Sequence, residues 1–75
     1  MSIISEVVVE LAEARERYEP FYSAHEGYAV LLEEVDELWA EVKKRPTERN
    51  VERMREEALQ IAAMAVRFIQ DVCDR

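Results

Sequence analysis

Two prolines divide this chain into three stretches in which apolar residues recur at helical spacing, and no other sequence feature restricts the fold as strongly. Pro20 and Pro46 end helical stretches because the residue before a proline is pushed away from the helical conformation, and only one glycine is present. Within each stretch, apolar side chains return every three or four residues, as one face of a helix requires. The pattern predicts an all-α chain: one domain, residues 1–75, with helices at about residues 2–18, 23–44 and 48–74.

The residues at the predicted breaks support these boundaries. Ser23 and Glu26 fit a capping box, in which each side chain accepts a hydrogen bond from the backbone N–H of the other residue. Thr47 and Asn50 are both suitable caps for the third helix, and the sequence does not choose between them. The short break around Pro46 favours antiparallel packing of the second and third helices.

The apolar faces are large for a chain of 75 residues, of which 49% are hydrophobic and 36% charged. The two classes must therefore lie on separate faces of each helix. Tyr28 and Trp39 belong to the stripe of the second helix, and we expect them to pack in the core. Because three short helices bury little apolar surface, we expect a second copy of the chain to cover the remainder, in a homodimer or a homotetramer. The stripe of the second helix consists of Tyr28, Leu31, Leu32, Val35, Leu38, Trp39 and Val42.

The net charge of −7 restricts the partners of the chain. Nucleic-acid binding requires basic patches that neutralise phosphates, so we expect no nucleic-acid partner. No apolar run approaches the ~18 residues that a membrane-spanning helix needs, and the first residues lack the basic segment of a signal peptide. A single cysteine, Cys73, cannot form a disulfide framework, which suits a reducing compartment. The expected location is the cytoplasm, with no membrane partner.

Acidic residues crowd one turn of the second predicted helix: Glu33, Glu34, Asp36 and Glu37. Glu34 lies at the border of the apolar stripe, and Glu57 has the same place on the third helix. Antiparallel packing of these helices therefore brings Glu34, Glu37 and Glu57 together. Hard divalent cations such as Mg²⁺ are held by carboxylate oxygens, usually with substrate phosphates completing the shell. The pattern favours a metal site, and its alternative is a solvated acidic face.

The acidic pattern also resembles that of a known superfamily. Glu33-Glu34-Val35-Asp36-Glu37, followed by Glu57-Ala58-Leu59-Gln60, resembles the EExxE…ExxD signature of the all-α NTP pyrophosphohydrolases, which include MazG, dimeric dUTPase and phosphoribosyl-ATP pyrophosphohydrolase. Residues 25–32 and 60–69 resemble the short MazG-like proteins of phage and bacterial genomes, and the resemblance covers roughly residues 25–72. It implies a three-helix chain that packs into an oligomeric helical bundle of MazG-like type.

The resemblance implies cleavage of a nucleoside triphosphate, NTP or dNTP, between the α- and β-phosphates to a monophosphate and pyrophosphate. The implied cofactor is Mg²⁺, with Mn²⁺ as its substitute. Glu33 would orient a ligand or activate the attacking water. Where the family pattern has Asp, this chain has Gln60, whose amide offers a carbonyl oxygen to the ion but supplies neither charge nor base. The implied metal ligands are Glu34, Glu37, Glu57 and Gln60.

Contacts to the substrate phosphates are only weakly indicated, because no phosphate-loop motif is present. They would come from a neighbouring subunit or from the basic residues Lys43, Lys44, Arg53 and Arg67. Two other functions stay open. One is a non-catalytic helical oligomer that serves as a binding or interaction module on the same scaffold, which the replacement at Gln60 motivates. The other is an acidic partner for a basic surface, such as a phage-encoded inhibitor.

Overall fold

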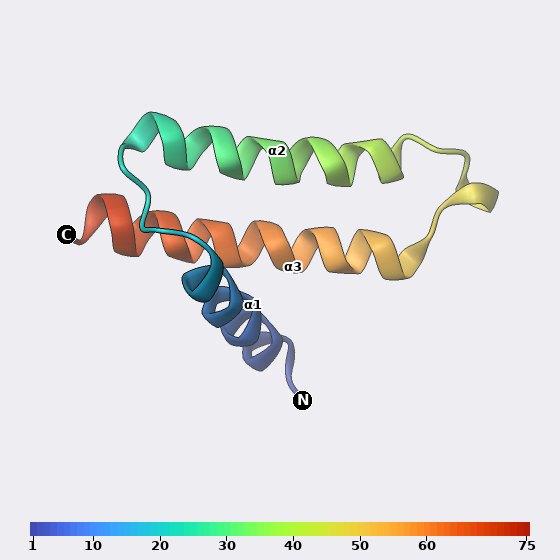
Figure 1. The fold of residues 1–75 in the computed structure, drawn as a ribbon. Helices are drawn as coiled ribbons and strands as arrows, with labels where there is room; N and C mark the ends of the chain where they lie inside the picture. Colours follow the sequence, from blue (N-terminus) through green and yellow to red (C-terminus); the bar gives the residue numbers. More distant parts are fainter.

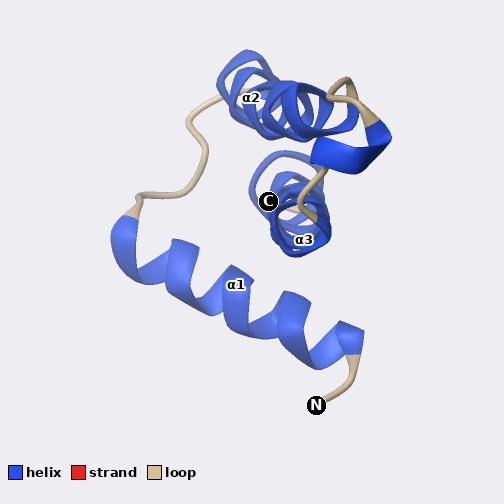
Figure 2. Cartoon of the chain, turned by 90° about the vertical axis from the view of Figure 1, so that its right-hand side faces the viewer, coloured by secondary structure: helices blue, strands red, loops and turns tan.

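A computed structural model describes residues 1–75 and contains helices and turns but no strand, so the predicted all-α class is confirmed. The helices α2 and α3 form an antiparallel hairpin, and α1 crosses α3 at a steep angle (Figure 1). Viewed along the hairpin, α1 lies on the side of α3 that faces away from α2 (Figure 2). None of the helices combines the length and the apolar character that crossing a bilayer would need. The elements are α1 (Ile3–Arg17), α2 (Ala24–Val42), a 3₁₀ turn η1 (Pro46–Glu48), α3 (Val51–Phe68) and a π-helical turn η2 (Ile69–Cys73).

Side-chain caps begin all three helices. Ser2 accepts a hydrogen bond from Ser5 N–H, and Ser23 accepts one from Glu26 N–H, each at 3.1 Å. Glu26 does not complete the capping box with Ser23, because its carboxylate accepts from the N–H of Tyr22, one residue earlier. Asn50 is the cap of α3, since Pro46, Thr47 and Glu48 form a separate 3₁₀ turn. The third helix therefore starts later than the predicted residue 48.

The core is small and lies where α1, α3 and the segment before α2 meet. Its buried hydrophobic residues are Ala14, Phe21, Ala63 and Met64. Gly27, the only glycine, lets α2 approach α3 closely, because a Cβ atom at this position would lie 2.7 Å from Cδ2 of Phe68. Because α2 and α3 approach closely, polar side chains on their facing edges can contact one another.

The outer face of α2 is uncovered. Tyr28 and Trp39, which we expected in the core, are 61% and 59% exposed. The reason is the place of α1, which packs on α3 and leaves no element over this part of the apolar stripe (Figure 2). Leu32 and Val35 share the exposed face. The interior is thus poorer in large side chains than the periodicity predicts.

Candidate metal centre

Three glutamates meet between the two long helices. Glu34 and Glu37 stand one turn apart on α2, and Glu57 reaches them from α3. One carboxylate oxygen from each lies within 4.8 Å of the others, a spacing compatible with ligation of a single cation. Antiparallel packing of α2 and α3 creates this arrangement, because it sets the middle of one helix against the middle of the other. The structure therefore brings together the three carboxylates that the helix faces predict to be neighbours.

These carboxylates are not compensated by the protein. Burial, followed by the hydrogen bond to Glu37 and the negative charges of Glu37 and Glu34, raises the pKa of Glu57 to about 7. Burial likewise raises the pKa of Glu34, with the charge of Glu37 as the next cause. Oε2 of Glu57 is buried and has no hydrogen-bond partner. No ion pair of the structure involves any of the three residues.

The chemistry of this donor set fits a hard divalent cation. Carboxylate oxygens are the ligands that Mg²⁺ and Mn²⁺ take, and a small number of protein carboxylates leaves coordination positions for water and phosphate oxygens. A cation among Glu34, Glu37 and Glu57 would relieve their mutual repulsion and would give the buried Oε2 of Glu57 a partner. The three side chains are thus a candidate site for such a cation.

Gln60 and Glu33 flank this group without being part of it. Gln60 is on α3, one turn beyond Glu57, and its amide nitrogen donates a hydrogen bond to Glu10 of α1. Because a carboxylate accepts and does not donate, the nitrogen must face Glu10 and the carbonyl oxygen must point away from it. Glu33 is exposed and lines a cavity beside Glu34. Periodicity does not predict the hydrogen bond between Glu10 and Gln60, since it does not tell which face of α3 a crossing helix covers.

The predicted phosphate-binding residues lie at two separate places. Arg53 is one turn before Glu57, and its Nε lies 3.7 Å from Oε2 of Glu41. Lys44 also pairs with Glu41, at 3.0 Å, and Lys43 beside it is exposed. Arg67 is ten residues after Glu57 on the same helix, or about 15 Å along its axis. Of these four residues, Arg53 is the nearest to Glu57 in helical register.

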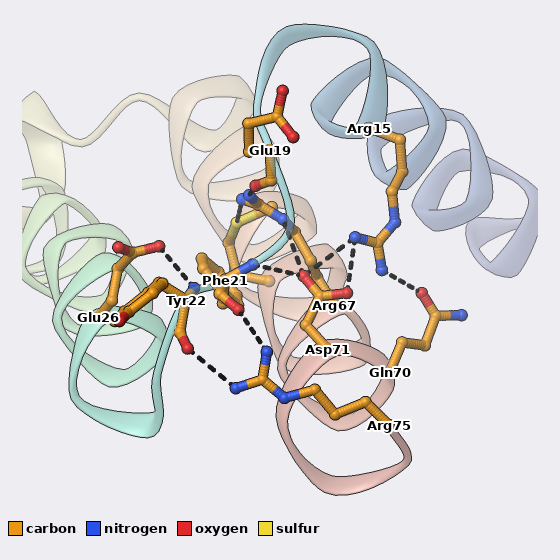
Figure 3. Close-up of polar contacts among 10 residues, drawn as sticks. Arg15, Glu19, Phe21, Tyr22, Glu26, Arg67, Gln70, Asp71 and Arg75 are labelled. Atoms are coloured by element: carbon orange, nitrogen blue, oxygen red, sulfur yellow. Dashed lines mark hydrogen bonds and ion pairs between the residues drawn. The ribbon is translucent and has the colours of Figure 1, made fainter.

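Arg67 belongs to a buried ionic cluster at the other end of the hairpin (Figure 3). Its guanidinium lies 4.0 Å from the centre of the Phe21 ring and donates to the carbonyl oxygen of Glu19 at 2.7 Å. Asp71, one turn later, accepts a hydrogen bond from Phe21 N–H at 2.9 Å and pairs with Arg15 at 2.8 Å. Burial alone raises the pKa of Asp71, but the Phe21 N–H and the Arg15 guanidinium outweigh it and lower the pKa. This cluster secures the segment between α1 and α2.

A cavity of about 510 Å³ connects the two regions. One wall is the segment 18–22, and the others come from α2 and α3. Glu33 and Glu34 line one part of it, and Arg67 lines another. Glu34 is therefore shared by the cavity and by the three-carboxylate group.

Comparisons with protein-family models, with curated proteins and with solved structures found no match. The likeness of the acidic pattern to the NTP pyrophosphohydrolases therefore stays a prediction. The positions of Glu34, Glu37 and Glu57, together with the cavity beside them, provide the basis for a functional conclusion.

Proposed function

We propose that this chain is a MazG-like nucleoside triphosphate pyrophosphohydrolase, which uses Mg²⁺ or Mn²⁺ to convert an NTP or dNTP to its monophosphate and pyrophosphate. The supporting observation is the convergence of Glu34, Glu37 and Glu57, whose oxygens lie within 4.8 Å of one another without a basic partner. Like-charged groups held together at a cost to stability are typical of functional sites. We propose that the protein acts in the cytoplasm as a homodimer or homotetramer.

Different residues of the chain have different roles in this proposed reaction. Glu34, Glu37 and Glu57 would hold the ion, and the orientation of Gln60 would leave its carbonyl oxygen free to face a ligand on the side away from Glu10. The ion would neutralise phosphate charge and lower the pKa of a bound water. Glu33, exposed at the cavity wall beside Glu34, accepts the proton of the attacking water. Cleavage of the α–β anhydride then releases pyrophosphate.

The test is pyrophosphate release by the purified protein with Mg²⁺ and a panel of common and modified NTPs and dNTPs. Turnover of at least one member is expected, and Glu57→Gln should abolish it because a ligand and its charge are lost. Glu56→Gln is the matched control, since Glu56 is an exposed neighbour on the same helix and forms no side-chain hydrogen bond or ion pair. If no member of the panel yields pyrophosphate with either ion, the catalytic proposal is wrong.

The exposed face of α2 supports a second candidate, a non-catalytic helical oligomer that serves as an interaction module. Tyr28, Leu32, Val35 and Trp39 follow one another at spacings of four, three and four residues, the pattern of a helix–helix seam. This candidate predicts self-association without any dependence on Mg²⁺. Sedimentation of the wild type and of Trp39→Glu, with and without Mg²⁺, tests it. A monomer at all concentrations would exclude it.

A further inference from the structure

The cavity beside the acidic group has the dimensions of a small-molecule site. Its volume of about 510 Å³ lies within the range of roughly 300–1,000 Å³ that is typical of ligand pockets. Apolar side chains, among them Val30 and Met64, form part of its wall. Because Glu34 lines the cavity, a molecule within it would be adjacent to any ion held by the three carboxylates. A nucleotide could then place its phosphates at the ion and the rest of the molecule in the cavity.

The wall formed by residues 18–22 is a loop whose backbone is held by hydrogen bonds to side chains. Side chains from α2, α3 and the C-terminal residues bind successive backbone groups of this segment (Figure 3). Because this segment is already ordered, a ligand does not have to order it on binding, and the entropic cost of binding is lower. The contacts are Arg67 to Glu19 O at 2.7 Å, Asp71 to Phe21 N at 2.9 Å, Arg75 to Tyr22 O at 2.9 Å and Glu26 to Tyr22 N at 3.1 Å.

The hydrogen-bonding groups left over at the wall are mainly acceptors. Arg67, the only cation lining the cavity, already lies over the Phe21 ring, donates to Glu19 O and pairs with Asp71, and only its buried Nε lacks a hydrogen-bond partner. Oε1 of Glu26 accepts a hydrogen bond from Tyr22 N–H, which orients the carboxylate. Oε2 of Glu26 has no hydrogen-bond partner in the protein. The tyrosines at the wall contribute largely exposed rings, suited to stacking against a flat ligand.

We propose that this cavity binds the nucleoside part of the substrate and that Glu26 selects bases that carry an exocyclic amino group. The placement of the phosphates rests on the proposed pyrophosphohydrolase function. Glu26 is eight residues before Glu34 on α2, which is about 12 Å along the helix axis. A nucleotide with its phosphates near Glu34 therefore has its base near Glu26 and the ring of Tyr22.

The selection follows from the chemistry of the base edges. Cytosine, adenine and guanine each present an amino group, which donates to a carboxylate. Uracil and thymine present a carbonyl oxygen where cytosine has its amino group, so a carboxylate would face another acceptor. A hydrogen bond from a base amino group to a charged carboxylate is expected to give roughly a tenfold preference.

Neutral nucleosides test this inference separately from catalysis. Cytidine, adenosine, guanosine, uridine and thymidine are titrated into the ¹⁵N-labelled protein without a metal, and amide shifts are followed. The expected result is that the first three shift the amides of Tyr22, Glu26 and Val30, and that uridine and thymidine bind about tenfold more weakly. Equal binding of cytidine and uridine, shifts confined to residues outside the cavity, or no binding of any nucleoside would overturn the inference.

Glu26→Gln provides the decisive variant. A glutamine can still accept from Tyr22 N–H, and the Ser23 cap uses only the backbone N–H of residue 26, so the fold is expected to persist. The amide can also donate to O4 of uracil, so the preference for cytidine over uridine should fall at least severalfold or reverse. Glu13→Gln is the control, since Glu13 is exposed on α1 and forms no side-chain hydrogen bond or ion pair. An unchanged preference in Glu26→Gln would refute the role of Glu26.

The two proposals fail in different ways. If nucleosides bind with the expected preference but no pyrophosphate is released, the catalytic proposal fails and the nucleoside site stands. If pyrophosphate is released equally from all bases, and Glu26→Gln leaves kcat/KM for each unchanged, the catalytic proposal stands and the selection by Glu26 is wrong.

Discussion

Two groups of charged side chains involve α3 and its C-terminal extension, and they differ in whether the protein compensates them. At one end of the hairpin, Asp71 is paired with Arg15 and Arg67 and accepts a backbone hydrogen bond. In the middle, Glu34, Glu37 and Glu57 face one another with no positive partner. Both groups are partly shielded from water, so the difference is one of charge balance.

This difference separates a structural role from a functional one. Removing a member of a balanced buried pair leaves an unpaired charge and is strongly destabilising. Removing a member of a like-charged group relieves repulsion, and adding a counter-ion does the same. The Asp71 group is therefore balanced in charge, whereas the glutamate group gains stability from either a proton or a cation. Each of the following experiments tests this contrast.

The largest effect is expected for Asp71→Ala. The substitution leaves the guanidinium of Arg67 buried without its carboxylate and removes the acceptor of Phe21 N–H. A loss of about 3–5 kcal/mol in the free energy of unfolding is expected, measured by urea denaturation. Asp74→Ala, at an exposed position, should change the same quantity by less than about 0.5 kcal/mol. Similar losses of unfolding free energy in both variants would show that the Asp71 group does not stabilise the fold.

Saturating Mg²⁺ or Mn²⁺ should stabilise the wild type. Binding to the folded state alone contributes about 2.7 kcal/mol when the free ion is at a hundred times its Kd. The midpoint of thermal unfolding should therefore rise with the ion and return when a chelator is added. Glu57→Gln should show little of this rise, while Asp71→Asn should keep it. An equal rise in wild type and Glu57→Gln would show that the ion binds elsewhere.

Stability without a cation should depend on pH in the direction set by Glu57. Its pKa rises from 4.5 to about 7 on folding, so its contribution to stability is complete below pH 4.5 and is lost as the pH rises through 7. Asp71, whose pKa is lowered from 3.8, contributes above that value and loses its contribution as the pH falls. The Glu57 term has a slope of at most about 1.4 kcal/mol per pH unit. Denaturation between pH 5 and 8 measures it, and a rise in stability over that range would contradict the prediction.

Glu34→Gln should have the smallest effect and the opposite sign to Asp71→Ala. Without a divalent cation at pH 8, the loss of one like charge should stabilise the fold by about 0.5 kcal/mol. With Mg²⁺ present, the same variant should bind the ion more weakly. Stabilisation with unchanged ion affinity would favour the non-catalytic oligomer over the enzyme.

The sequence was sufficient for the helices and for the meeting of the three glutamates. Both follow from local periodicity, since Glu34 and Glu57 border their apolar stripes and a short connection makes the helices antiparallel. The position of Asn50 as the cap of α3 was one of two alternatives, and the 3₁₀ turn that excludes Thr47 has no clear local signal.

The parts that could not be predicted depend on contacts between distant residues. Arg67 was considered for phosphate binding, but its position against Phe21 and Asp71 is set by how α1 leads into α2. The exposure of Tyr28 and Trp39 has the same origin, because a hydrophobic stripe does not show which of its sides a third helix covers. The contact of Glu10 with Gln60 joins residues 50 positions apart, beyond the reach of any local pattern.

The position of Glu34, in both the three-carboxylate group and the cavity wall, has a thermodynamic consequence. Glu34 belongs to the three-carboxylate group and to the wall of the cavity, so under the proposed function an ion at the one would alter the free energy of binding a molecule in the other. Linkage is reciprocal: if the ion tightens a nucleotide by some factor, the nucleotide tightens the ion by the same factor. Under the proposed function, the ion and the nucleotide would each bind more tightly in the presence of the other.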